Sequence, residues 1–506
     1  MPSRLTLALS LGLAAAGVAC LHAGAAQAQT LRIGLQDDAD ILDPHKSRTY
    51  VGRIVYTALC DKLVDVTPEL TFVPQLATEW TTSEDGRTLT FTLRDGVTFH
   101  DGTPFDAEAV KANLDRARGL PDSMRKSELA SVESVEVIDP RTVALKLKQP
   151  DAPLLAQLSD RAGMMLSPAA MESPDFGSSP VCSGPFRFKE RVQQDRIVLE
   201  RYDGYWNKDA YHFDEIVYRP IPDTTVRLAN LRSGDLDLIE RTAPTDVPGI
   251  ESDASLKIER VTGLGFQPIE INTGHGERAE TPWGQDKRLR QALELSIDRE
   301  AINQVVFAGL YTVGNQPFPP NSPYYNADLP IKPRDVEKAK ALLAEAGQPN
   351  PTIELKVTNS TNNQQVGQII QAMAAEAGIT VNLRVSEFAA LLQEDEAGDF
   401  QASQIGWSGR PDPDGNIHQF VTCEGNLNDG RYCNPQVDDL LNQAREVSEP
   451  AERKALYDQV MTILADELPY IYMYFEPRIF TMTTRLEGFE AHPDGMIRLA
   501  DVTLAE

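Results

Sequence analysis

Apolar and polar residues alternate over several short stretches of this chain, and each stretch predicts a β-strand. In residues 88–93, leucine and phenylalanine alternate with threonine, so one face of the strand is apolar and the other polar. The turn residues Asp95 and Gly96 follow, and Val97 and Phe99 resume the alternation. The pattern therefore predicts a β-hairpin over these residues.

Helical spacing of apolar residues begins after aspartates, which are favoured N-cap residues. Asp106 precedes one such segment, and Asp298 separates two others. A further helix is predicted over residues 335–346, where Gly347 and Pro349 end the pattern. These helices lie between predicted strands, which indicates an α/β protein.

A strand–helix–strand unit is predicted in the second half of the chain. Residues 353–357 and 381–385 are apolar strands, and residues 366–377 form the helix between them. This spacing is typical of a right-handed crossover with parallel strands. Residues 401–407 predict the next strand of that sheet, so the loop after Trp407 begins where ligands bind in open α/β sheets.

The first 28 residues have the pattern of a secretory signal peptide. Arg4 precedes an apolar run, and small residues at positions 26–28 form a cleavage site. A lipoprotein would use Cys20, but Gly17 stands where a lipobox has a leucine-like residue. We therefore expect a soluble periplasmic protein exported by a cleavable signal. No later segment reaches the ~20 apolar residues of a membrane helix.

Length and charge narrow the class of protein further. A chain of 506 residues is long enough for two to four lobes. The net charge is −27, which argues against nucleic acid and against anionic membrane surfaces as partners. Four cysteines remain after signal removal, which predicts disulfide bonds with three possible pairings.

Motifs of catalysis, cofactor binding or metal binding are absent from the sequence. There is no GxSxG, HExxH, phosphate-binding loop or GxGxxG after a strand, and no CxxC pair that would hold zinc. The histidines of the mature chain are scattered singly: His45, His100, His212, His275, His418 and His492. We expect neither an enzyme nor a bound cofactor or metal.

Seven segments carry a resemblance to a known family. Residues 91–116 (FTLRDGVTFHDGTPFDAEAVKANLDR) are nearly identical to a segment of the family 5 extracellular solute-binding proteins, the peptide-type binding proteins of ABC importers. Six more segments are similar to that family in the same order: 74–80, 183–186, 202–206, 213–216, 288–293 and 297–301. The resemblance thus covers the mature chain.

The resemblance implies a three-lobed periplasmic binding protein whose two main lobes close on a ligand by hinge motion. The first main lobe would comprise residues 29–58, 176–265 and 478–506. Residues 59–175 would form a smaller inserted lobe of mixed α/β structure, and residues 266–477 the second main lobe.

The resemblance also implies ligand-binding residues, and this chain departs from them. Trp407 matches a tryptophan that covers the ligand, but Arg410 replaces the aspartate that binds a peptide's amino terminus. Asn359 stands where dipeptide binders have an arginine for the ligand carboxylate. A buried Arg410 needs an anion, either a ligand carboxylate or Asp412, and we favour a ligand with an exposed acidic group. Tyr50, Phe266 and Gln267 are further candidates to line the cleft.

A disulfide between Cys423 and Cys433 is implied by the resemblance to dipeptide-binding proteins, with Cys60 and Cys182 as the default second pair.

The sequence therefore predicts a monomeric periplasmic protein that binds a peptide or related small solute. It would deliver this ligand to an ABC permease with cytoplasmic ATPase subunits. The alternatives are a ligand sensor for a chemoreceptor or kinase, and a binder of a non-peptide solute such as an opine, glutathione or oligosaccharide. The identity of the ligand does not follow from the sequence.

Overall fold

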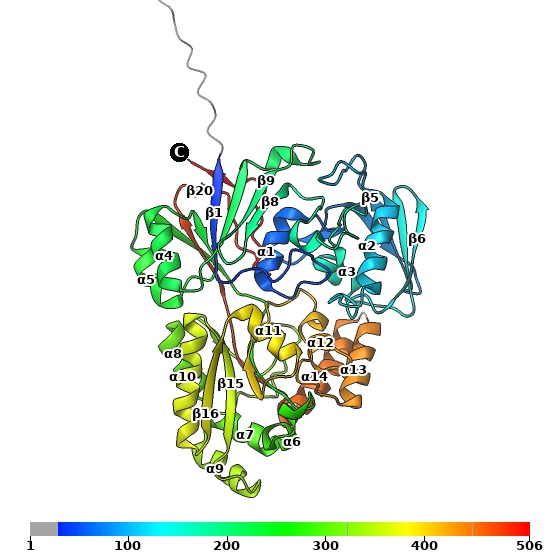
Figure 1. The fold of residues 1–506 in the computed structure, drawn as a ribbon. Coiled ribbons are helices and arrows are strands. Elements are labelled where there is room, and N and C mark those ends of the chain that lie inside the picture. Colours follow the sequence, from blue (N-terminus) through cyan, green and yellow to red (C-terminus); the bar gives the residue numbers. More distant parts are fainter. Residues whose placement is uncertain (1–28, 321, 448, 506) are drawn as a thin grey trace, which may run out of the picture.

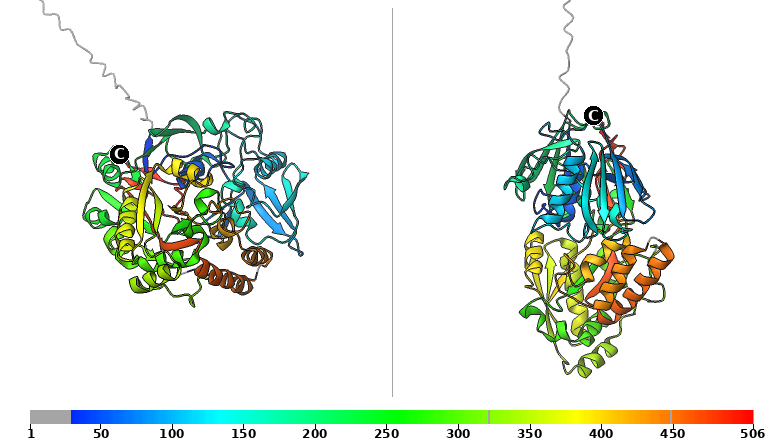
Figure 2. Two further views of the ribbon diagram at one scale, coloured as in Figure 1. Left: turned by 60° about the horizontal axis from the view of Figure 1, so that its bottom comes forward. Right: turned by 90° about the vertical axis from the view of Figure 1, so that its right-hand side faces the viewer.

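The computed structural model describes residues 29–505 except 321 and 448. The predicted signal peptide, residues 1–28, lies outside the described residues. Two large sheets occupy the upper and lower halves of the molecule in Figure 1, and a smaller sheet lies beside the upper one. The views in Figure 2 show the same two halves from other sides. We keep the names and boundaries of the three predicted lobes as a working division.

A seven-stranded mixed sheet forms the first main lobe. Its central strand β1 pairs in parallel with β10 and β11, and the other pairs are antiparallel. In spatial order the strands are β12 (Leu256–Val261), β19 (Arg478–Thr483), β11 (Leu238–Ile239), β1 (Thr30–Leu35), β10 (Glu215–Pro220), β9 (Arg196–Arg201) and β8 (Phe186–Val192).

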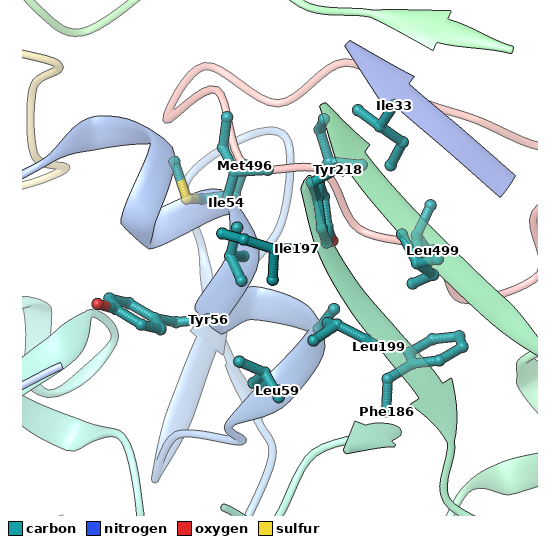
Figure 3. Packing of buried hydrophobic residues seen from close by; sticks show 14 of the residues in the cluster. Ile33, Ile54, Tyr56, Leu59, Phe186, Ile197, Leu199, Tyr218, Met496 and Leu499 are labelled. Atoms are coloured by element: carbon teal, nitrogen blue, oxygen red, sulfur yellow. The ribbon is translucent and has the colours of Figure 1, made fainter. Parts of the chain in front are cut away.

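One hydrophobic core joins this sheet to helix α1 (Tyr50–Leu59). Thr49 caps the helix by accepting the N–H of Gly52. Ile54 and Leu59 of α1 lie opposite side chains of β9 and β10 in Figure 3. This packing fixes the position of the start of α1. Helices α4 (Thr224–Ser233) and α5 (Val247–Glu251), and strands β20 (Leu486–Glu487) and β21 (Thr503–Leu504), complete the lobe.

The inserted lobe contains a four-stranded antiparallel sheet packed against helix α2 (Ala107–Gly119). Asp106 caps α2, as predicted, by accepting the N–H of Ala109. The sheet order is β4 (Ala77–Thr82), β5 (Thr88–Leu93), β7 (Thr142–Leu147) and β6 (Val132–Asp139). The lobe also contains strands β2 (Val64–Val66) and β3 (Phe72–Pro74), which precede the sheet in the sequence, and helix α3 (Leu154–Leu158), which follows it.

The predicted hairpin over residues 88–99 is wrong. Strand β5 pairs with β4 on one edge and with β7 on the other, so neither edge is free for a second strand at Val97. Val97 and Phe99 are buried in the same core, but Thr98 makes only an isolated bridge with Pro104. The apolar alternation reflected burial of a loop rather than strand pairing.

A six-stranded sheet forms the second main lobe. The predicted crossover is present: β15 and β16 are parallel and α10 packs on both, while β17 pairs in parallel with the other edge of β15. In spatial order the strands are β14 (Thr312–Val313), β18 (Tyr470–Phe475), β13 (Gln267–Ile271), β17 (Ala402–Gln404), β15 (Thr352–Thr358) and β16 (Thr380–Ser386).

The helices of the second main lobe complete its two hydrophobic cores. They are α6 (Pro282–Gln285), α7 (Lys287–Ser296), α8 (Arg299–Phe307), α9 (Val336–Glu345), α10 (Thr361–Glu376), α11 (Phe388–Glu396), α12 (His418–Val421), α13 (Pro435–Glu446) and α14 (Pro450–Glu467). None of the helices in the described part of the chain has the length and apolarity needed to cross a membrane.

The chain passes between the two main lobes at two adjacent places. Residues 262–266 lead from β12 to β13, and residues 476–477 return from β18 to β19. These strands pair with one another in both sheets. The two crossing segments touch, since a Cβ atom added to Gly263 would lie 2.4 Å from the carbonyl oxygen of Glu476.

Both expected cysteine pairs are present as disulfides. Cys60 is bonded to Cys182, and Cys423 to Cys433. The second bond closes a short loop that faces the first main lobe, because Asp429 of this loop is ion-paired with Arg48 at 2.6 Å.

Candidate functional site

A pocket of about 1140 Å³, open solvent included, lies between the two main lobes. The first lobe contributes Asp37 after β1, Arg48 and Tyr50 at the start of α1, and Arg241 after β11. The second lobe contributes residues of β13 and β18, the Trp407 loop, the start of α10 and the disulfide loop. Small-molecule sites commonly lie between lobes in this way.

Aromatic side chains form the wall of the pocket on the second lobe. Phe266 and Trp407 exchange backbone hydrogen bonds of 3.0 and 2.8 Å, which fix the loop after β17 against the start of β13. The Trp407 indole donates to Asn416 Oδ1 at 3.0 Å and is 9% exposed. Phe420 and Tyr470 continue this wall. Trp407 therefore lines the pocket, and its contact with a ligand stays a prediction.

Arg410 lies outside the pocket, in a buried ion pair that joins two lobes. Its Nε is 2.6 Å from the carboxylate of Asp160 in the inserted lobe, and its guanidinium stacks over Trp407 at 4.1 Å. Arg53 of α1 pairs with the same carboxylate at 3.0 Å. Burial would raise the pKa of Asp160, but Arg410 and Arg53 hold it well below its usual range. We call Arg53, Asp160 and Arg410 the lobe latch.

Asp412, one of the two anions considered for Arg410 from the sequence, is not its partner. Asp412 instead accepts two hydrogen bonds from Arg453, at 2.9 and 3.0 Å, within the second lobe. Sequence spacing favoured Asp412 because it is near in the chain, whereas Asp160 is contributed by a different lobe. Asp160 supplies Arg410 with an anion, which Arg410 shares with Arg53, so the need of Arg410 for a partner is no longer an argument for an acidic ligand.

The other predicted residues divide between the pocket and its surroundings. Tyr50 lines the pocket, and its hydroxyl donates to Gly495 O at 2.9 Å. Phe266 and Gln267 also line it, and the amide of Gln267 donates to Glu476 at 3.3 Å. Asn359 lies next to lining residues of β15 and α10 but is not itself part of the lining.

Positively and negatively charged residues line the pocket, and they are not among the residues predicted from the sequence. Arg48 pairs with Asp429 at 2.6 Å across the two main lobes. The Arg241 Nε lies 3.5 Å from Glu476, while neither of its Nη atoms donates a hydrogen bond to another described residue. The pocket can therefore meet a solute that carries both a carboxylate and an amino group.

Two carboxyl groups in the pocket have no ion-pair partner among the described residues. Burial raises the pKa of Asp37 to about 6, although Arg241 acts to lower it. Glu270 on β13 is 3% exposed, and burial with the nearby Asp429 and Asp395 raises its pKa well above the usual value.

The sequence contains a signal for some of these residues. Asp37 follows the end of strand β1, where ligands bind in α/β sheets, and Glu270 interrupts an apolar strand. Arg241 follows a two-residue strand that no periodicity reveals. Within the described residues, no group of three or more His, Cys, Asp or Glu side chains is placed to hold a metal ion.

Comparisons with known proteins agree with this geometry. Residues 71–428 match the family model of bacterial extracellular solute-binding proteins, family 5 middle. The chain is 30% identical over 510 residues to the glutathione-binding protein GsiB of Escherichia coli strain K12, covering 97% of this chain and 98% of that protein.

Solved structures share the fold over almost the whole chain. The binding protein AgaA from A. tumefacien R10, in complex with agropinic acid, has a TM-score of 0.87 and 26% identity, covering 94% of this chain and 99% of that one. The oligopeptide-binding protein AppA from Bacillus subtilis, in complex with a nonapeptide, has a TM-score of 0.86 and 25% identity, covering 95% and 100%. The chain belongs to the family 5 bacterial extracellular solute-binding proteins.

Proposed function

We propose that this protein is the periplasmic binding component of an ABC importer for a peptide or a related amino-acid-derived solute. The observation that carries the proposal is the pocket between the main lobes, lined by aromatic side chains and by charges of both signs. The ligands named for the relatives, which are glutathione, agropinic acid and a nonapeptide, are of this chemical kind.

In this proposal, binding and delivery depend on contacts between residues of different lobes. Arg48 with Asp429, and Arg410 with Asp160, join residues of different lobes. A solute that touches both lobes favours the closed form, because it gains its full contacts only there. The closed monomer, exported by its cleavable signal peptide, then presents the solute to the permease. It performs no chemistry on the solute.

Native mass spectrometry of protein purified gently from the periplasm tests this function. A co-purified peptide or amino-acid derivative, released unchanged on denaturation, is the expected result. Small-angle X-ray scattering of the protein stripped of ligand should show a larger radius of gyration, which falls when the released compound is added. A radius that does not respond to any co-purified or added solute would contradict the proposal.

A further inference from the structure

Glu270 is a buried carboxyl group that faces the pocket without a cation. It lies on β13 next to the last residue of the strand, is 3% exposed and belongs to the pocket lining. Its Oε1 accepts the N–H of Gly430 at 2.7 Å. Among the described residues, no lysine, arginine or histidine nitrogen lies within 4.0 Å of its carboxylate. Ionised carboxylates are rarely buried unless they are paired.

The cations near Glu270 are already paired with other carboxylates. Arg48 contacts Asp429 at 2.6 Å, and Lys356 contacts Glu394 at 2.8 Å. Asp395 accepts a hydrogen bond from Ser403 at 2.6 Å, and its carboxylate is 3.9 Å from Lys356. Glu270 is thus the member of this acidic group that is left without a positive partner.

The environment favours the neutral form of Glu270 while the pocket holds no cation. Burial is the main cause of its raised pKa, and the negative charges of Asp429 and Asp395 add to it. The Gly430 N–H and the Tyr470 hydroxyl act in the opposite direction. A positive group placed against Glu270 would stabilise the ionised form and release a proton.

Aromatic rings border the same part of the pocket. Phe420 is the centre of this wall, with its ring centroid 4.9 Å from Trp407, 5.8 Å from Phe266 and 6.3 Å from Tyr470. Tyr470 pairs with Glu270 across strands β18 and β13. Aromatic faces attract cations that have lost part of their hydration.

We propose that Glu270 and this aromatic wall form a subsite for a positively charged nitrogen group of the solute, an ammonium or a guanidinium. The inference rests on the proposed function, because it concerns the same pocket. It adds that the solute supplies the positively charged partner that Glu270 does not have among the described residues. The group belongs either to a peptide's amino terminus or to a basic side chain.

Calorimetric titration of four tripeptides into the wild type, E270Q and D37N tests the subsite and identifies the source of the charge. Ala-Lys-Ala against Ala-Met-Ala reports a basic side chain. Ala-Ala-Ala against its N-acetylated form reports the amino terminus. We expect the wild type to prefer the charged member of at least one pair by about tenfold or more, the loss of one charge-assisted bond. E270Q should lose that preference, whereas D37N, which lacks another buried carboxylate of the pocket, should keep it.

Proton release gives a second measurement that does not depend on a variant. Wild-type titrations in two buffers of different ionisation enthalpy should show proton release on binding of the charged member of the preferred pair, and none on binding of its neutral counterpart. Peptide binding without preference, a preference retained in E270Q, or one lost in D37N alone would overturn the subsite and leave the proposed function intact. If no peptide binds and no solute co-purifies, the proposed function fails and the subsite with it.

Discussion

Replacing Arg410 with methionine tests whether the lobe latch holds the closed form together. Methionine keeps an unbranched apolar side chain over Trp407 but removes the contact of 2.6 Å with Asp160. Asp160 retains Arg53, which contacts it at 3.0 Å, so the substitution leaves no carboxylate without a cation. The change therefore removes one bond between lobes, together with the hydrogen bond of 2.8 Å that Arg410 donates to Gly409 O within its own loop.

The size of the effect follows from the kind of bond that is lost. A hydrogen bond to a charged group contributes about 1.5–3 kcal/mol. Burying Arg410 costs desolvation energy that offsets part of this gain, so we expect the lower end of the range. About 1.4 kcal/mol is a tenfold change in an equilibrium constant. The closed population of the free protein should fall about tenfold, and the apparent Kd should rise by the same factor.

The assay compares solutes that differ in charge. Calorimetry of R410M with a peptide and with its C-terminal amide should show about the same tenfold loss for both, since Arg410 lies outside the pocket. Scattering should show a larger fraction of open protein at equal solute concentration. Arg453 offers a matched control, because R453M removes a buried arginine whose partner Asp412 lies in the same lobe. R453M should lower the thermal stability without changing closure.

Two results would refute this reasoning. A loss of affinity confined to the peptide with a free carboxylate would mean that Arg410 contacts the ligand. Unchanged affinity and unchanged scattering in R410M would mean that the latch does not contribute to closure.

Three further predictions concern other parts of the molecule. Burial raises the pKa of Asp61 to about 7, so the wild-type stability should fall as pH rises from about 4 to 7. Thermal melts of D61N should show a smaller fall over this range, and the same pH dependence in D61N and the wild type would contradict the prediction. Replacing Cys423 and Cys433 with serine opens a short loop and should lower the free energy of unfolding by about 3 kcal/mol. A denaturant titration measures this change, and an unchanged midpoint would contradict the prediction. R241M should abolish any preference for a free carboxylate over an amide, and a retained preference would place the carboxylate elsewhere.

Much of the fold could be predicted because local sequence and global packing agree. Asp106, Asp298 and Asp335 cap the helices that follow them, each by accepting a backbone N–H. The crossover over residues 352–386 was predicted from apolar runs of the correct length. The failure at Val97 and Phe99 has a physical cause, since apolar alternation records burial and cannot show whether a strand edge is free.

The site was less predictable because its charges pair across lobes. Arg410 and Asp160 are 250 positions apart in the chain, and Arg48 and Asp429 are 381 apart. No local pattern encodes such a pairing. The position of Trp407 at the pocket could be predicted because Trp407 follows a strand of the sheet. The partner of Arg410 could not be predicted without knowing how the three lobes are arranged.

The two crossing segments at Gly263 and Glu476 limit how the halves of the molecule can move. They lie side by side and touch, so bending about a line through both changes few contacts, whereas twisting would slide one segment along the other. Bending is then the relative motion of the halves that the crossing segments favour. One pair of fluorescent labels, placed on α8 and α4, would report it as a change in one distance.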